Sequence, residues 1–370
     1  MKTKISTLEL LASIMVFENG TAILFYLASD TKQDAWITIL IYIIPAIILQ
    51  LIYTSLWYNY PNDNIITYSP KIFGKYIGFF LSIVYILYFI YGAARVLRDF
   101  SELMLISTLP KLPLTLVSFI LITVICYATF TGIEVLCRIA VVFLCIFLSF
   151  FTLSFIFLST TPNALHLTNL KPIMHNSLLF LIIKGWPLIT FPFGESLLFS
   201  MFYTSVTEPK KVRKYTIMAT IFEGFILSFN CIMFLSTLGV KLASTSLFPL
   251  LQTFRTIHAG SAFDRLDIFI ILMLLLGGFF KIGFFIYGAM LGTASLVKIN
   301  NPKYLSIPIS IIVLISSGLI ASNYPQHVNI GLDFTIKYIH LPMLIILPIL
   351  ALIIVNIKKF VSSNNQRGRL

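Results

Sequence analysis

Residues 186–195 read WPLITFPFGE, and they interrupt an apolar run over residues 178–203 that is long enough to cross a lipid bilayer. The two prolines each remove a helical hydrogen-bond donor, and Gly194 allows backbone angles that other residues avoid. Glu195 adds an acid at membrane depth, where a charged or non-helical segment persists only if protein or a water-filled cavity shelters it. The stretch therefore predicts a broken transmembrane helix beside a polar site.

The rest of the chain is too apolar for a water-soluble core. Of its 370 residues, 58% are hydrophobic and only 11% are charged. We expect an all-α integral membrane protein in the lipid bilayer, with about ten transmembrane helices. The expected spans are residues 7–28, 36–57, 77–96, 114–130, 136–158, 178–203, 215–240, 268–297, 304–321 and 338–357. They form a single transporter-like domain over residues 1–359, followed by a short polar tail over residues 360–370.

The net charge of +12 does not indicate nucleic-acid binding, because the basic residues lie between the apolar runs and not on one water-facing surface. The densest group, at residues 210–214, directly follows one span and precedes the next. Lys and Arg are in excess in the loops that share a side with both termini, so we expect the N- and C-termini to be cytoplasmic.

A second interruption is expected in the first span, where residues 17–21 read FENGT. Asn and Gly weaken a helix, and Glu18 again places an acid at bilayer depth. The first and sixth spans are corresponding members of two five-span halves, and paired interrupted helices predict a transporter-type binding site at the midplane. Free amides there suit a carboxylate, and free carbonyls suit an amine or a cation.

Lys281 lies in the middle of the eighth span, too deep for its ammonium to reach water easily. It needs an anionic or carbonyl partner, for which Glu18, Glu195 and free carbonyls of the first span are candidates. The ammonium could then supply the positive charge that a bound sodium ion would otherwise supply. The alternative is a buried pair that only fixes helix packing.

Other polar or small residues inside the spans are further candidates. Glu223 in the seventh span is either a proton site or a buried hydrogen-bond partner. The third-span residues Tyr88, Gly92 and Arg95 share one helix face and could line the cavity, although packing is the commoner role of such residues. In the eighth span we add Gly283 and Tyr287, for which packing and interface roles are the alternatives.

No enzyme is predicted, because the chain has no hydrolase triad pattern, glycine-rich phosphate loop or HExxH motif. The four cysteines fall within apolar stretches without metal-ligand spacing, so no metal and no other cofactor is expected. The five histidines, His166, His175, His258, His327 and His340, fall in or beside loops and are expected to be solvated.

Taken in order along the chain, six short motifs resemble the spore germination permease family, the B subunits of nutrient germinant receptors. They are ISTLEL at 5–10, KQDAW at 32–36, VLRDF at 96–100, LPKLP at 109–113, FGE at 193–195 and RLD at 265–267. One departure is Glu18, where many members have a Gly-rich stretch. This acid either favours an amine ligand or neutralises Lys281.

The resemblance implies the fold of the amino acid, polyamine and organocation transporters, a five-plus-five inverted repeat with discontinuous first and sixth helices. The ligand-binding residues that it implies lie at the two breaks, with the eighth-span candidates beside them: Asn19, Gly20, Thr21, Phe193, Gly194, Glu195, Lys281, Gly283 and Tyr287. It also implies a sensor in the spore inner membrane, which binds a small-molecule nutrient such as an amino acid and acts with the A and C subunits of the receptor. A proton- or sodium-coupled amino acid permease has the same fold and site and remains the alternative, as does a scaffold or a conduit for ions or water.

Overall fold

The computed structural model describes residues 4–162, 164–256 and 266–367, and within them the chain is almost entirely helical. Nine helical segments of this part are long and apolar enough to cross a membrane. The main helices are α2 (Ala35–Asn59), α4 (Lys75–Ser107), α5 (Leu114–Thr131), α6 (Ile133–Thr160), α8 (Val212–Thr245), α10 (Leu266–Val297), α11 (Ser306–Leu319) and α13 (Leu347–Arg367). The expected all-α, multi-pass membrane architecture is confirmed.

Further elements precede these helices or lie between them. Five are α-helical: α1 (Thr7–Ala22), α3 (Ile65–Phe73), α7 (Leu178–Gly185), α9 (Pro249–Phe254) and α12 (Tyr324–Asn329). Seven are 3-10 turns: η1 (Ser29–Asp34), η2 (Leu167–Leu170), η3 (Trp186–Ile189), η4 (Phe193–Met201), η5 (Tyr203–Ser205), η6 (Pro209–Lys211) and η7 (Pro302–Leu305). A π-helical segment, η8 (Ile330–Ile346), connects α12 to α13.

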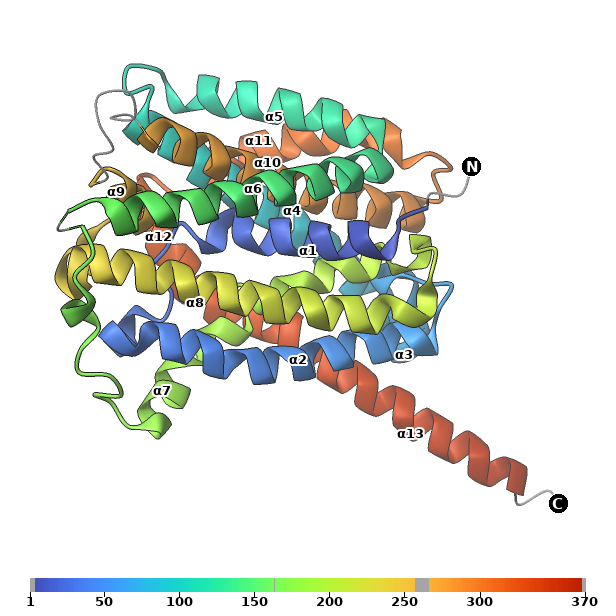
Figure 1. Cartoon of the computed structure of the whole chain (residues 1–370). Coiled ribbons are helices and arrows are strands. Elements are labelled where there is room, and N and C mark those ends of the chain that lie inside the picture. The colour runs from blue at the N-terminus through green and yellow to red at the C-terminus, as the bar shows by residue number, and fades with distance from the viewer. Residues whose placement is uncertain (1–3, 163, 257–265, 368–370) are drawn as a thin grey trace.

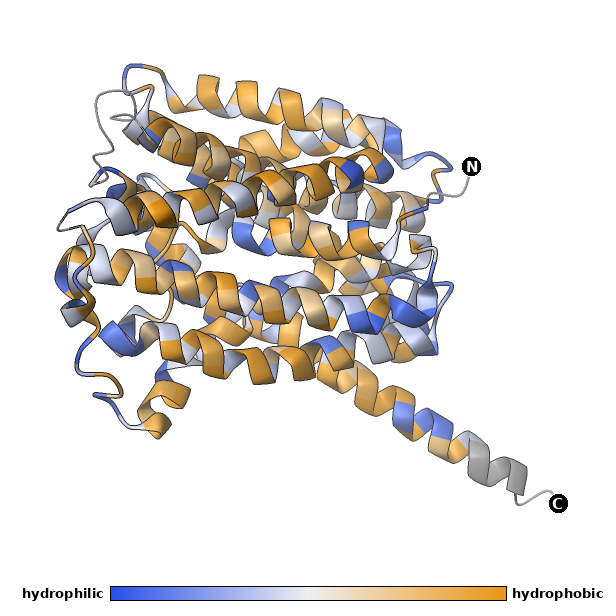
Figure 2. Cartoon of the chain, viewed as in Figure 1, coloured by the Kyte–Doolittle hydropathy of each residue, from blue (hydrophilic) through white to orange (hydrophobic). Residues whose placement is uncertain are grey.

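The helices lie roughly side by side, and both ends of the chain emerge at the same end of the bundle (Figure 1). We call this the terminal end and the opposite one the distal end. Hydrophobic residues cover the length of the outer helices, whereas hydrophilic residues gather at the two ends (Figure 2). Ile120 of α5, Ile146 of α6 and Ile311 of α11 are exposed on this apolar surface. Such side chains suit lipid as the solvent.

Helix α1 lies inside the bundle, packed against α6, α8 and α10. Every residue from Leu10 to Ala22 is buried. A capping box starts the helix: the Ser6 side chain accepts from the Glu9 amide, and the Glu9 side chain accepts from the Ser6 amide. With 16 residues, α1 is shorter than each of the nine candidate membrane-spanning segments.

The expectation that the first span unwinds at residues 18–21 is wrong, because α1 continues through them and ends at Ala22. Two contacts explain the difference. The Asn19 side-chain amide donates to the Met15 carbonyl one turn earlier, at 3.0 Å. Gly20 faces Gly277 of α10, where an added Cβ would lie 2.8 Å from the Gly277 carbonyl oxygen. Gly20 therefore permits close helix packing and does not break the helix.

The sixth span is interrupted as expected. Helix α7 stops at Gly185, the chain continues through the 3-10 turn η3, and a second 3-10 segment, η4, begins at Phe193. Pro187 and Pro192 lack amide donors, so an α-helical ladder cannot run through this stretch. The break lies where the sequence predicts it.

Main-chain pairing joins the N-terminus to the end of this broken element. The Ile5 amide donates to the Ser205 carbonyl at 2.9 Å, and the Thr207 amide donates to the Ile5 carbonyl at 2.9 Å. The result is an isolated parallel bridge between Ile5 and Val206. It is the one strand-like contact in the described part of the chain.

The apolar stretch after Phe248 forms α9, whose residues are mostly buried and pack against α8 and α10. The RLD motif begins at Arg265, which lies outside the described residues. At the other end of the chain, α13 projects from the bundle and continues to Arg367, so the expected tail begins as helix (Figure 1).

Candidate functional site

The centre of the bundle holds a buried ion pair. The Lys281 ammonium of α10 lies 2.6 Å from Glu195 Oε2, and the two side chains are 0% and 6% exposed. The ammonium also lies over two aromatic rings, 4.8 Å from the centroid of Phe17 and 5.2 Å from that of Phe191. Ring faces attract cations, so the charge is enclosed by one carboxylate and two aromatic rings. Of the three partners considered for Lys281, the structure shows Glu195.

The break in the sixth span positions Glu195 for this pair. The Gly194 carbonyl, freed from a helical ladder, accepts from the Tyr53 hydroxyl at 3.2 Å. An added Cβ on Gly194 would lie 2.8 Å from the Ile189 carbonyl oxygen, so the turn requires glycine. Phe193 is fully buried beside Gly224 of α8. Side chains of neighbouring helices thus replace the contacts that an intact helix would make itself.

A second polar group joins α1 to α8. The Asn19 side-chain amide donates to Glu223 Oε2, so Glu223 is at least a buried hydrogen-bond partner. Glu18 is fully buried, and neither of its carboxyl oxygens has a hydrogen-bond partner within the described residues. Three buried carboxyl groups, Glu18, Glu195 and Glu223, therefore accompany one buried ammonium.

A small cavity lies beside Glu195, with a volume of about 40 Å³. Thr21 at the end of α1, Phe191 at the break, and residues of α4, α12 and η8 line it. Its polar lining residues include Arg95, Asp99, Glu195, Thr335 and His340. Ligand pockets are commonly at least about 300 Å³, so this conformation encloses the polar groups without room for an amino acid.

A larger cavity of about 160 Å³ adjoins the first toward the distal end, lined by Ser29, Asp30 and Lys184 among others. Phe191 and Leu332 line both cavities. These two apolar side chains therefore form the partition between them.

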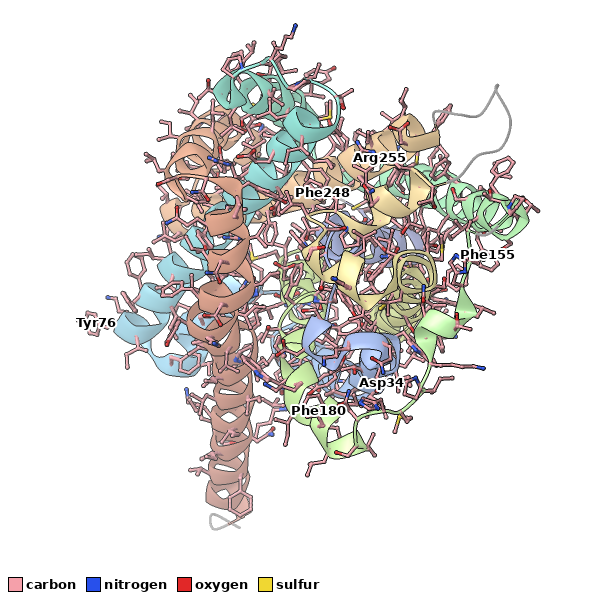
Figure 3. All side chains as sticks on the ribbon, turned by 90° about the vertical axis from the view of Figure 1, so that its left-hand side faces the viewer. Asp34, Tyr76, Phe155, Phe180, Phe248 and Arg255 are labelled. Carbon is pink, nitrogen blue, oxygen red and sulfur yellow. The ribbon has the colours of Figure 1, made fainter. Side chains whose placement is uncertain are left out.

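The distal side of the site is covered by a cluster of polar and aromatic side chains. Arg95 Nη2 donates to the His327 carbonyl at 3.1 Å, and His327 Nε2 lies 3.1 Å from Asp99 Oδ1. The Tyr324 ring stacks on His327 with centroids 5.9 Å apart, and the Phe248 ring lies 5.6 Å from that of Tyr324. Figure 3, which looks onto the distal end, shows Phe248 near the middle of the view.

The structure brings some of the expected site residues together and separates others. Thr21, Gly92 and Glu195 line the small cavity. Tyr88 lies next to it, with its ring 5.7 Å from that of His340. Gly283 faces Leu136 and Ile125 instead, and Tyr287 lines a separate cavity of about 710 Å³ at the terminal end.

Three residues at the site, His327, His340 and Asp99, were missed from sequence. His327 and His340 are buried, so the expectation that all five histidines are solvated is wrong for these two. His327 is held within the bundle because α12 and η8 continue the last span toward the distal end. Asp99 belongs to the VLRDF motif, which lies inside α4 because this helix runs to Ser107 and not to Val96. The sequence could have indicated Asp99 only if the third span had been extended past Val96, as α4 extends in the structure.

Comparisons with known proteins agree with one another. A family model described as "Spore germination protein" matches residues 4–325. Spore germination protein KB of Bacillus subtilis (strain 168) is 36% identical over 361 residues, which cover 97% of this chain and 96% of that protein. Spore germination protein YndE of the same organism is 25% identical over 363 residues, or 95% of this chain and 96% of that protein. The chain, a multi-pass membrane protein with a buried ionic site at a broken helix, therefore belongs to the spore germination protein family.

Proposed function

We propose that this protein is a nutrient germinant receptor subunit of the spore inner membrane, with both termini in the cytoplasm. A small polar solute enters from the distal end, binds beside the broken sixth span, and starts germination together with the A and C subunits of the receptor. The observation that carries the proposal is the buried Lys281–Glu195 pair beside a closed polar cavity, in a chain of a germination family.

The small volume of the cavity gives this function a physical mechanism. The solute needs more space than about 40 Å³, so binding requires a conformation in which Phe191 or Leu332 has moved. A ligand that fits one conformation better than another shifts their populations. Partner subunits in contact with the moving segments would then respond to the shift.

The proposal is tested in spores that lack this chain, complemented either with the intact chain or with Gly194→Leu. The Leu side chain would clash with the Ile189 carbonyl and with Leu344 at the break. We expect the deletion to abolish the response to at least one nutrient, the intact chain to restore it, and Gly194→Leu to fail despite normal abundance in the membrane. Unchanged responses of the deletion strain to every nutrient would refute the proposal.

A flux measurement separates a sensor from a permease. Purified protein reconstituted alone into vesicles should bind its nutrient without net uptake. Sustained accumulation of the labelled nutrient, driven by a proton or sodium gradient, would show that the chain transports it.

A further inference from the structure

A further cavity lies at the side of the bundle, between Phe100 of α4, Val124 of α5 and Ile282 of α10; we call it the lateral pocket. Its volume is about 190 Å³, and every residue that lines it is apolar. None of these residues lines the two cavities beside the broken sixth span. The proposed function therefore gives the lateral pocket no role.

The lateral pocket has a buried floor and an exposed mouth. Phe100, Ile125 and Ile282 at its floor are at most 2% exposed, whereas Val124 at its rim is 56% exposed. Ile120, one turn before Val124, belongs to the apolar outer surface. Helix α5 forms an edge of the bundle (Figure 1). The mouth therefore faces the surroundings of the protein and not its interior.

Those surroundings are lipid hydrocarbon at the depth of the pocket. Val124 lies near the middle of α5, and Ile282 lies midway along α10, directly after Lys281. Apolar cavities stay free of water, and the side chains that line this one offer a water molecule no hydrogen bond. The molecule available to fill the pocket is therefore a lipid chain.

Van der Waals contact is what a lipid chain gains in the pocket. Moving a chain from the bilayer into the pocket brings no hydrophobic gain, because lipid tails are as apolar as the lining side chains. An empty cavity, however, leaves the atoms of its wall without contact partners. Apolar cavities of about 150 Å³ take up benzene, so the lateral pocket has room for a short stretch of a flexible chain.

The floor of the lateral pocket adjoins the ionic site. Phe100 follows Asp99, which lines the small cavity, and Ile282 follows Lys281. The Phe100 ring lies against Gly278 of α10, where an added Cβ would be 2.2 Å from the ring. A chain in the pocket therefore packs on side chains that are next in sequence to two groups of the site.

We propose that the lateral pocket binds one acyl chain of a membrane lipid, which enters past Val124 and packs against Phe100. The chain fills the space between α4, α5 and α10 and holds the Phe100 ring on Gly278. The positions of α4 and α10 at the ionic site are thereby supported from the lipid side. This inference goes beyond the proposed function, because it applies equally to a sensor and to a permease.

The test uses the full chain in lipid nanodiscs that contain a phospholipid with a photoreactive diazirine near the methyl end of one acyl chain. Residues labelled on illumination are identified by mass spectrometry. Lipid around the protein labels exposed residues such as Ile120, whereas Phe100 is buried and is reached only from within the pocket. Because the diazirine labels only what it contacts, we expect Phe100 to be labelled at least about tenfold more than Phe89, which is equally buried on α4 but outside the pocket.

Two variants fill the pocket from different helices. Ile125→Phe enlarges a floor residue of α5, and Leu275→Phe enlarges a partly buried lining residue of α10. Each should lower the labelling of Phe100 about tenfold, because the added ring occupies the space that the chain needs. The matched control is Ile120→Phe, which adds the same ring on the lipid-facing side of α5 outside the pocket. It should leave the labelling of Phe100 unchanged.

Labelling of Phe100 no stronger than that of Phe89 in the parent protein would overturn the inference, whether or not the variants fold. Equal labelling of Phe100 in the parent and in both filled variants would also overturn it. A free alkane carrying the same diazirine is the last comparison. If the alkane labels Phe100 and the phospholipid does not, the pocket takes a free apolar molecule, and its assignment to a lipid chain is wrong. None of these results bears on the response of spores to nutrients, which tests the proposed function separately.

Discussion

Removing the Lys281 ammonium tests whether the central ion pair stabilises the fold. In Lys281→Met the apolar stem is kept, but the Glu195 carboxylate, 6% exposed, loses its partner at 2.6 Å. Breaking a buried pair from one side typically costs about 3–5 kcal/mol, because the remaining charge is left in a medium of low polarity. We expect the free energy of unfolding to fall by this amount.

The double variant Lys281→Met, Glu195→Leu distinguishes a loss of pairing from a loss of packing. It removes both charges and keeps the volume approximately constant, so most of the lost stability should return. The assay is equilibrium unfolding of the full chain in mixed micelles, followed by fluorescence. Lys211→Met, which removes the exposed partner of Glu208 at the terminal end, serves as control and should leave the transition unchanged. A single variant as stable as the parent, or a double variant no better than Lys281→Met, would refute the reasoning.

Two other predictions concern Gly20 and Phe191. Gly20→Val should destabilise the fold by about 1–3 kcal/mol, because its Cβ would lie 2.8 Å from the Gly277 carbonyl oxygen and 2.9 Å from Lys281 Cβ. Gly318→Val, where nothing lies within 4 Å, is the control, and equal unfolding free energies for the two variants would contradict the close contact. Phe191→Ala should join the small cavity beside Glu195 to the larger cavity on its distal side. Association of the ligand should then be faster, as measured by stopped-flow fluorescence. An unchanged association rate would show that Phe191 is no barrier.

The sequence predicted the position of the helix break correctly in the sixth span but not in the first, for a physical reason. At the sixth, Pro187 and Pro192 lack amide donors, a local property that no neighbour can restore. At the first, Asn19 and Gly20 only weaken a helix, and contacts with α8 and α10 decide the outcome. Local propensity therefore predicted the position of one break correctly. At the other, packing keeps residues 18–21 helical, and the first span is interrupted only after Ala22, over residues 23–28.

The residues of the candidate site likewise include some that the sequence could predict and some that it could not. Glu195 and Lys281 could be found because charges deep in apolar spans stand out in the sequence. The roles of His327 and His340 could not, because their burial depends on how α12 and η8 fold back over α4. The space around the Arg95 guanidinium depends on Gly331, which is more than 200 positions away in the sequence. The spacing of residues within a single helix cannot predict a contact between helices so far apart in the chain.

The bridge between Ile5 and Val206 gives the broken sixth span a mechanical link to the start of the chain. Both of its hydrogen bonds run between main-chain atoms, so the linkage survives exchange of either side chain. A shift of residues 193–206 that begins beside Glu195 would pull on residue 5 and, through the Ser6 cap, on α1. The segment around Ile5 is thereby placed to report movements that originate beside Glu195.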